Sequence, residues 1–167
     1  MIQVRPVRPE EFEEAGKVVL DAYTSLPGEN MSEGYAEVLA DVARRAGDAV
    51  VLVAVEDTDE TVAGCVTFVP DHTSPWAELV EPGESAIRML AVRPSGQGRG
   101  VGRLLVEHCI ESARQQGSDA LVLHSTPRME AAHRLYDRLG FVRVPERDWF
   151  PAPDIPLLAF RLDLAGG

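Results

Sequence analysis

A glycine-rich turn between a strand-like segment and an amphipathic helix constrains this chain most. Four glycines fall within residues 96–102, after an apolar segment (86–92) that predicts a strand and before a segment (101–116) with apolar residues at helical spacing. Glycine allows positive φ and close backbone approach to a ligand, and a helix N-terminus has unpaired N–H groups and a partial positive charge. The turn therefore predicts an anion site suited to phosphate, to which Arg99 and Arg103 add positive charge.

Two common phosphate-binding motifs do not fit this turn. A P-loop requires lysine after its last glycine, whereas Arg103 follows Gly102 here. A dinucleotide fingerprint requires G-x-G-x-x-G, whereas Gly98, Gly100 and Gly102 are spaced as G-x-G-x-G. The next expected strand ends in His124 and not in the acidic residue that would hold a ribose.

Composition excludes several classes of protein. The 167 residues suit one domain, 1–167, and 45% hydrophobic with 26% charged residues is typical of a soluble globule. The net charge of −11 disfavours nucleic-acid binding, because phosphate backbones require a basic face. The two cysteines suggest no disulfide framework, and neither they nor the four histidines have metal-ligand spacing. We find no signal peptide and no long apolar run, so we expect a cytoplasmic protein without membrane contact.

Hydrophobic periodicity and turn residues predict the order β-α-α-β-β-β-α-β-α-β-β, which is an α+β (α/β sandwich) arrangement with a mixed sheet. The expected strands are 2–7, 49–55, 61–69, 85–92, 120–124, 141–144 and 157–164. Four helices are expected. The first begins at Pro9, and the second covers 35–43 with Gly47 just beyond its end. The third begins at Val101, and the fourth follows an N-cap at Ser125 or Thr126.

Two motifs give the chain a family resemblance. Gln97, Gly100 and Gly102 match the Gln/Arg-x-x-Gly-x-Gly/Ala loop of the GNAT (Gcn5-related N-acetyltransferase) family, and residues 131–141 resemble its A-x-x-L-Y-x-x-x-G-F segment. The element order is also that of the family, so the resemblance covers nearly the whole chain. It implies a mixed, mostly antiparallel sheet flanked by helices and acetyl-CoA as co-substrate. It also implies direct acetyl transfer, in a ternary complex, to a primary amine of a small molecule or peptide; dimers are common in the family, so a homodimer is one expectation.

The resemblance also implies where the cofactor binds. The strand before the turn would pair with the pantetheine arm as another strand does, and the amides of residues 97–103 would hold the pyrophosphate. On the last helix, Met129 stands where the family often has an asparagine that contacts CoA. The expected cofactor-binding residues are Leu90, Ala91, Val92, Gln97, Gly98, Arg99, Gly100, Val101, Gly102, Arg103, Met129, Ala132 and His133.

Acetyl transfer to an amine needs one proton removed from the ammonium and another supplied to the leaving thiolate. Tyr136 matches the tyrosine that the family places near the CoA sulfur, and a phenol pKa of about 10 lies close enough to a thiol's ~8.5 for proton donation. Many family members carry a glutamate base where this chain has Ala86; Glu84, two residues earlier on the same face of the strand, is the candidate that replaces it. His124 is a weaker candidate, and a solvent-relayed proton is the remaining alternative.

Two other functions stay open at this point. The missing glutamate at Ala86 leaves room for a non-catalytic CoA-binding module, and another acyl-CoA could replace acetyl-CoA. The acceptor site is expected among the variable loops 23–34, 70–83 and 145–156, the last two of which carry tryptophans. The sequence does not identify the acceptor.

Overall fold

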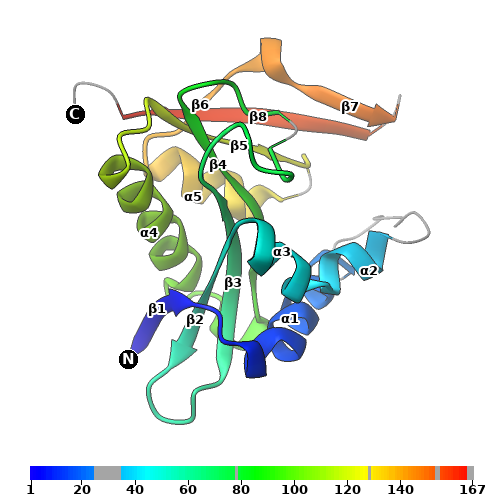
Figure 1. Ribbon diagram of the computed structural model, residues 1–167, viewed down its shortest axis with the longest axis vertical. Coiled ribbons are helices and arrows are strands. Elements are labelled where there is room, and N and C mark those ends of the chain that lie inside the picture. Colours follow the sequence, from blue (N-terminus) through cyan, green and yellow to red (C-terminus); the bar gives the residue numbers. More distant parts are fainter. Residues whose placement is uncertain (25–34, 78, 128, 153–154, 165–167) are drawn as a thin grey trace.

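A twisted sheet forms the centre of this computed structural model, which describes residues 1–24, 35–77, 79–127, 129–152 and 155–164 (Figure 1). Its strand order within those residues is β1-β2-β3-β4-β5-β8-β6, with β7 paired to β8. Only β4 and β5 run parallel among the described pairs, so the expected mixed, mostly antiparallel sheet is confirmed. The strands are β1 (Ile2–Pro6), β2 (Val50–Glu56), β3 (Val62–Val69), β4 (Glu84–Val92), β5 (Ala120–Ser125), β6 (Val142–Arg143), β7 (Trp149–Ala152) and β8 (Ile155–Asp163).

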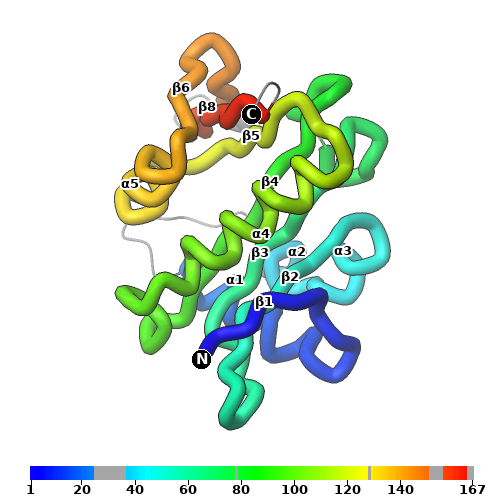
Figure 2. The backbone as a smooth tube through the Cα atoms, turned by 90° about the vertical axis from the view of Figure 1, so that its left-hand side faces the viewer, coloured from blue at the N-terminus to red at the C-terminus, as the bar shows by residue number. Residues whose placement is uncertain are grey.

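Helices cover both faces of the sheet. Figure 2 shows α4 and α5 on one side and the three N-terminal helices on the other. The helices are α1 (Phe12–Thr24), α2 (Tyr35–Ala40), α3 (Val42–Asp48), α4 (Val101–Gln115) and α5 (Glu130–Arg138), with short 3₁₀ turns η1 (Pro9–Glu11), η2 (Pro94–Gly96) and η3 (Pro145–Arg147). This arrangement confirms the expected helices flanking the sheet.

Two apolar clusters follow from the alternation of side chains along the strands. Leu52 and Ala54 of β2 belong to the cluster under α4 and α5, whereas Val51 and Val53 belong to the cluster under α1–α3. Successive residues of a strand point to opposite faces, so an all-apolar strand such as β2 serves both clusters. The two cysteines are free and buried, one in each cluster, as small core residues.

Some element boundaries differ from expectation. The helix expected over 35–43 is divided at Asp41, whose side chain accepts a hydrogen bond from the Arg44 amide (3.2 Å) and caps α3; Gly47 lies inside α3 and not beyond it. The last helix begins at Glu130, after an N-cap at Met129, because Ser125 still belongs to β5. The proline-rich segment expected as a loop contains β7, which pairs with β8. Residues 25–34 of the first expected acceptor loop lie outside the described residues.

The separation of β4 from β5 positions the functional site. Only Glu84–Ala86 of β4 pair with β5, although β4 continues to Val92. On its other edge β4 has a bulge: Cys65 opposes Ala91 and Thr67 opposes Arg88, so that Met89 and its successor share one residue of β3. Met89 adopts φ 55°, which is unusual for a non-glycine residue. The β5-facing edge of β4 beyond Ala86 is thus open to a ligand.

Candidate active site

An open groove of about 630 Å³ follows the end of β4, the glycine turn and the start of α4. Helix α5 supplies its opposite wall, and α1 supplies Asp21 and Ala22. The residues that line it are Asp21, Ala22, Leu90, Ala91, Val92, Pro94, Gly96, Gln97, Gly98, Gly100, Val101, Gly102, Arg103, Met129, Glu130, Ala131, Ala132, Leu135 and Arg138.

The glycine turn has the backbone that an anion site requires. Gly98 and Gly100 both have φ 79°, in the left-handed region that other residues rarely adopt. Gly100 is the N-cap of α4, and its carbonyl accepts the Leu104 amide at 3.0 Å. The amides of residues 101–103 lie in the first turn of α4, so they have no hydrogen-bond partner within this 15-residue helix. They lie at its N-terminus, the positive end of the helix dipole, beside the groove.

The structure brings eleven of the expected cofactor-binding residues together along this groove and places two elsewhere. The Arg99 guanidinium forms an ion pair with Glu56 of β2. His133 Nε2 lies 3.1 Å from Ser125 Oγ, and its ring packs against Phe160 with centroids 5.1 Å apart. Burial lowers the pKa of His133 below its usual value. Neither Arg99 nor His133 belongs to the described lining of the groove.

Sequence reasoning missed several lining residues. Ala131, Leu135 and Arg138 follow one another at intervals of four and three, so they share one face of α5 with the groove. That spacing was a usable signal, and it adds Arg138 to the groove that Arg103 also lines. No pattern in the sequence pointed to the bulge at Met89.

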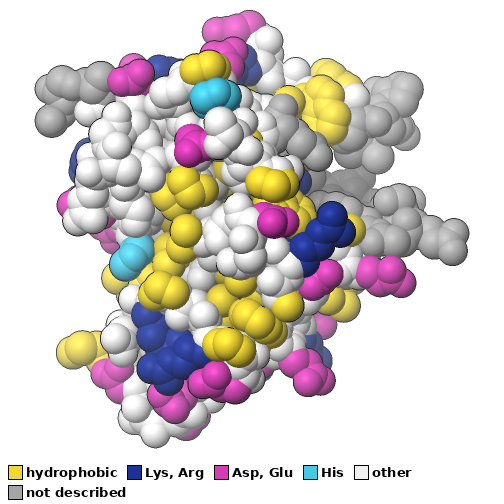
Figure 3. Space-filling model, viewed as in Figure 1, with side chains coloured by type: hydrophobic (Ala, Val, Ile, Leu, Met, Phe, Trp, Pro, Cys, Tyr) yellow, Lys and Arg dark blue, Asp and Glu magenta, His cyan; other side chains and the backbone are white. Residues whose placement is uncertain are grey.

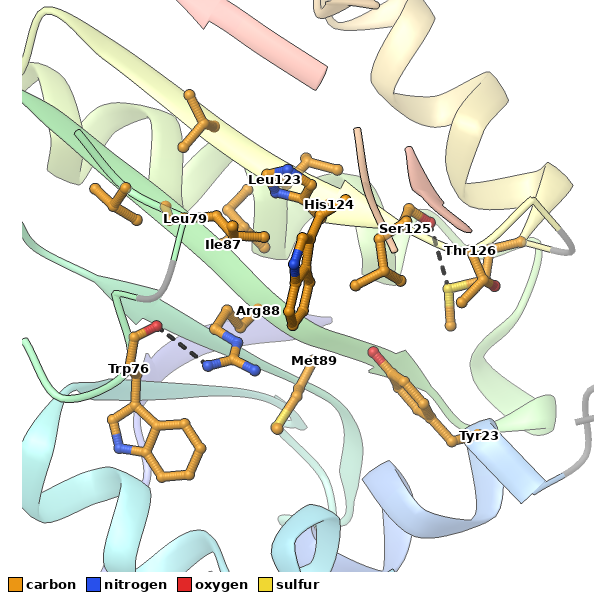
Figure 4. Close-up of a pocket in the computed structure, with 16 residues that line it drawn as sticks. Tyr23, Trp76, Leu79, Ile87, Arg88, Met89, Leu123, His124, Ser125 and Thr126 are labelled. Atoms are coloured by element: carbon orange, nitrogen blue, oxygen red, sulfur yellow. Dashed lines mark hydrogen bonds between the residues drawn. The ribbon is translucent and has the colours of Figure 1, made fainter. Parts of the chain in front are cut away.

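A second pocket lies on the other side of the gap between β4 and β5. Figure 4 shows Trp76, Arg88, Met89, His124 and Tyr23 around it. Met129 lines both cavities, so the pocket and the groove meet there. The lining comprises Tyr23, Trp76, Leu79, Val80, Ala86, Ile87, Arg88, Met89, Val122, Leu123, His124, Ser125, Thr126, Met129, Trp149 and Leu157.

His124 is held in one tautomer at the wall of this pocket. Its Nε2 lies 2.9 Å from the carbonyl oxygen of Arg147. A carbonyl only accepts, so Nε2 carries the proton and the neutral ring presents Nδ1 as a lone-pair acceptor. Burial lowers the pKa of His124 below its usual value, so the ring is neutral at pH 7. A neutral imidazole whose Nδ1 carries the lone pair has the chemistry of a general base.

Glu84, the expected base, is engaged in other contacts. Its carboxylate accepts bonds from Arg147 (2.7 and 2.9 Å), from Arg161 (2.6 Å) and from the Glu81 amide (3.0 Å). Burial is the largest single effect and raises the pKa of Glu84, but the hydrogen bonds from Arg147 and the Glu81 amide and the charges of Arg147 and Arg161 together outweigh it, so the pKa lies below its usual value. A carboxylate stabilised in this way is a weak proton acceptor. The contacts favour an anchoring role, and the role as base stays a prediction.

Tyr136 lies in the core between α5 and the sheet. Its side chain is 4% exposed, and its ring packs against Phe141 and Phe160 with centroids 5.6 and 5.7 Å apart. Burial raises the pKa of the Tyr136 phenol, which keeps it protonated at neutral pH. The residue is absent from the described lining of both cavities. Its role as proton donor stays a prediction.

The surface around the pocket is apolar at the β7 end of the molecule. Hydrophobic side chains gather there in Figure 3, and Trp149 and Phe150 are 38% and 56% exposed.

Over the described residues, no cluster of His, Cys, Asp and Glu could hold a metal ion. No helix in the described part of the chain is sufficiently long and apolar to cross a bilayer.

Comparison with protein families gives one match. The model of the acetyltransferase (GNAT) family matches residues 17–141. Mycothiol acetyltransferase from Rhodococcus jostii is 40% identical over 63 residues, 38% of this chain and 21% of that protein. The [ribosomal protein bS18]-alanine N-acetyltransferase of Escherichia coli is 35% identical over 72 residues, 42% of this chain and 49% of that protein. The chain thus spans between about a fifth and a half of the length of these relatives.

Solved structures share the fold over almost the whole chain. A GNAT-family acetyltransferase from Staphylococcus aureus superposes with a TM-score of 0.76 at 15% identity and covers 98% of this chain and 99% of its own. PaiA N-acetyltransferase from Thermoplasma acidophilum, solved with coenzyme A, has a TM-score of 0.72 at 15% identity and covers 98% of this chain and 99% of its own. The structure of yncA from Salmonella typhimurium, which contains acetyl-CoA as its cofactor, has a TM-score of 0.69 at 21% identity and covers 100% of this chain and 96% of its own.

Proposed function

Because the chain belongs to the acetyltransferase (GNAT) family and is an N-acyltransferase enzyme, we propose that it transfers the acetyl group of acetyl-CoA to a primary amine of a small molecule or peptide. The transfer is direct, with both substrates bound at once. One observation carries this proposal: a groove with a glycine-rich anion site and a separate pocket meet at Met129, where β4 and β5 part. The two substrates reach each other from opposite sides of that gap.

The groove holds the CoA part of the donor. Of the amides at residues 97–103, those of Gly98 and residues 100–103 take the pyrophosphate, because the Gln97 and Arg99 amides donate to the carbonyls of Pro94 and Gly96. Arg103 and Arg138 support them. The open edge of β4 at residues 90–92 takes the pantetheine arm through main-chain hydrogen bonds. The bulge at Met89 turns the backbone where the groove gives way to the pocket, so the thioester would reach the acceptor there.

Two proton transfers accompany the reaction. The amine nitrogen forms a bond to the acetyl carbon, and the carbon–sulfur bond breaks with its electron pair on sulfur. His124 Nδ1 takes the amine proton, directly or through water, because Arg147 holds the ring in the required tautomer. Tyr136 supplies a proton to the departing thiolate. Glu84 acts on His124 through Arg147, whose guanidinium it fixes while the Arg147 carbonyl orients the imidazole.

Incubation with acetyl-CoA and a panel of amines tests this function. We expect amine-dependent release of free CoA thiol, acetylated product by mass spectrometry, and inhibition by CoA that is competitive with acetyl-CoA. The sharpest control is the same mixture without amine, which measures thioester hydrolysis alone. CoA binding without amine-dependent thiol release from any member of the panel would contradict the transferase and indicate a CoA-binding module. Localisation in the cytoplasm and a homodimer stay predictions.

A further inference from the structure

We propose that the pocket on the far side of the β4–β5 gap binds an amine that also carries a carboxylate, and that Arg88 recognises that carboxylate. This inference rests on the proposed acetyl transfer, since it names the class of amine that enters the same site. Its substrate is an amino acid or amino-acid-like molecule with a small apolar side chain.

The charge of the pocket is the first observation. Among the described residues that line it, Arg88 carries the one permanent charge and none is acidic. His124 is neutral at pH 7 because burial lowers its pKa. A polycationic amine would find no counter-charge among these described lining residues, although the whole chain carries a net charge of −11. The positive charge on the pocket lining is therefore opposite to the net charge of the chain, and it favours an acceptor with an anionic group.

The geometry of Arg88 is the second observation. Its guanidinium donates one hydrogen bond to the Trp76 carbonyl (3.1 Å) and lies over the Trp76 ring, 5.4 Å from the centroid. It forms no ion pair with any carboxylate of the described residues. Figure 4 shows it between Trp76 and Met89, with Tyr23 directed toward the pocket from α1. A guanidinium has five N–H donors in a fixed fork, so one side is fixed by Trp76 and others remain for a planar, bidentate carboxylate.

A second arginine adds to the positive potential. Arg45 of α3 is fully buried and donates to the carbonyl of Leu39 (2.9 Å) and to that of Val38. The pKa of Arg45 is lowered, chiefly by burial and in smaller part by the charge of Arg88, while Asp41 opposes that effect. The charges of Arg45 and Arg88 repel each other, and an anion bound to Arg88, in a pocket whose described lining residues include no acid, offsets that repulsion.

The remaining walls define the rest of the acceptor. Leu79, Val80, Trp149 and Leu157 are apolar, and together with Trp76 they leave space for an uncharged side chain. His124 on β5 faces the same pocket as Arg88 on β4, so one acceptor can present its amine to the base and its carboxylate to the arginine.

Matched acceptors test the proposal on the full chain. Leucine, leucinamide and 3-methylbutylamine share the same apolar group and differ in a carboxylate, a neutral amide or neither. We expect Arg88→Gln to raise the KM for leucine by roughly 10- to 100-fold, as loss of charge-assisted hydrogen bonds does, and to change the KM for leucinamide less than about threefold. Arg88→Lys should retain part of the preference, and Arg114→Gln, on the exposed face of α4, should leave it unchanged.

The comparison of variant to wild-type ratios removes the difference in amine basicity between leucine and its amide. Equal losses for leucine and leucinamide in Arg88→Gln, or a wild-type enzyme whose preference does not depend on Arg88, would overturn the proposal. Calorimetric binding of N-acetylleucine against N-acetylleucinamide gives an independent test without catalysis. Arg88-dependent binding of the carboxylate without any amine acetylation would overturn the proposed function but not this inference. Acetylation of amines without selectivity for a carboxylate would support the proposed function and overturn this inference.

Discussion

Substitution of Glu84 by glutamine separates an anchoring carboxylate from a catalytic one. Its side chain is 4% exposed and contacts Arg147 and Arg161, whose side chains are 20% and 32% exposed. Breaking a fully buried pair costs about 3–5 kcal/mol, and the partly exposed arginines reduce that to about 2–3 kcal/mol. For a chain of this size, each kcal/mol corresponds to roughly 2–4 °C, so we expect Tm to fall by about 4–12 °C.

Thermal unfolding at pH 7 and initial rates on the same preparations test this prediction. Glu81→Gln is the matched control, because the Glu81 side chain is 67% exposed and lies 4.0 Å from Arg147, so its effect should stay within about 0.5 kcal/mol. Since the folded pKa of Glu84 is lowered, its stabilisation is present above the unfolded pKa of about 4.3 and is lost as pH falls through the folded pKa. An unchanged Tm with kcat reduced a hundredfold or more would refute the anchor and restore the base.

Three further predictions concern the turn, the tyrosine and the histidine. Gly100→Ala should lower the free energy of unfolding by about 1–2 kcal/mol, because φ 79° is unfavourable for a residue with Cβ, and should raise the KM for acetyl-CoA. The control is Gly47→Ala, inside α3 and without positive φ, which should not destabilise the protein. Equal Tm shifts for the two variants would refute the reasoning. Tyr136→Phe should lower kcat by roughly 10²-fold or more with little change in Tm, and an unaltered kcat would exclude the proton donor. In the wild type kcat/KM should rise with pH through the lowered pKa of His124; His124→Gln should lose that acidic limb, and a retained limb would exclude His124 as the base.

The sequence predicts the main elements because each is encoded locally. Strands β2 and β3 are continuous apolar runs between turns, and α4 follows a glycine turn with helical spacing, so both were recognised with nearly the observed bounds. The split at Asp41 was missed although its signal is local, because aspartate is a preferred N-cap and accepts the amide three residues further on. The strand β7 was missed because its pairing with β8 depends on tertiary contacts. Prolines around β7 also indicated a loop, although prolines are tolerated at the edge of a sheet.

The site was predicted unevenly for the same reason. Residues of the glycine turn line the groove because backbone conformation there follows from glycine itself. The bulge at Met89 has no sequence signal, and it depends on how β3 and β4 pair. The two arginines that contact Glu84 are more than sixty positions away in the sequence, so their effect on its pKa could not be read from its place in the strand. Arg88 was passed over because only the folded pocket shows that it lacks an acidic neighbour among the described lining residues.

A crystal structure of the protein with coenzyme A tests the central claim most directly. We expect the pyrophosphate on the amides of Gly98 and residues 100–103, the pantetheine arm along residues 90–92 of β4, and the sulfur at the junction beside Met129. Coenzyme A bound elsewhere, or a pantetheine arm that leaves the open edge of β4 unpaired, would contradict the account.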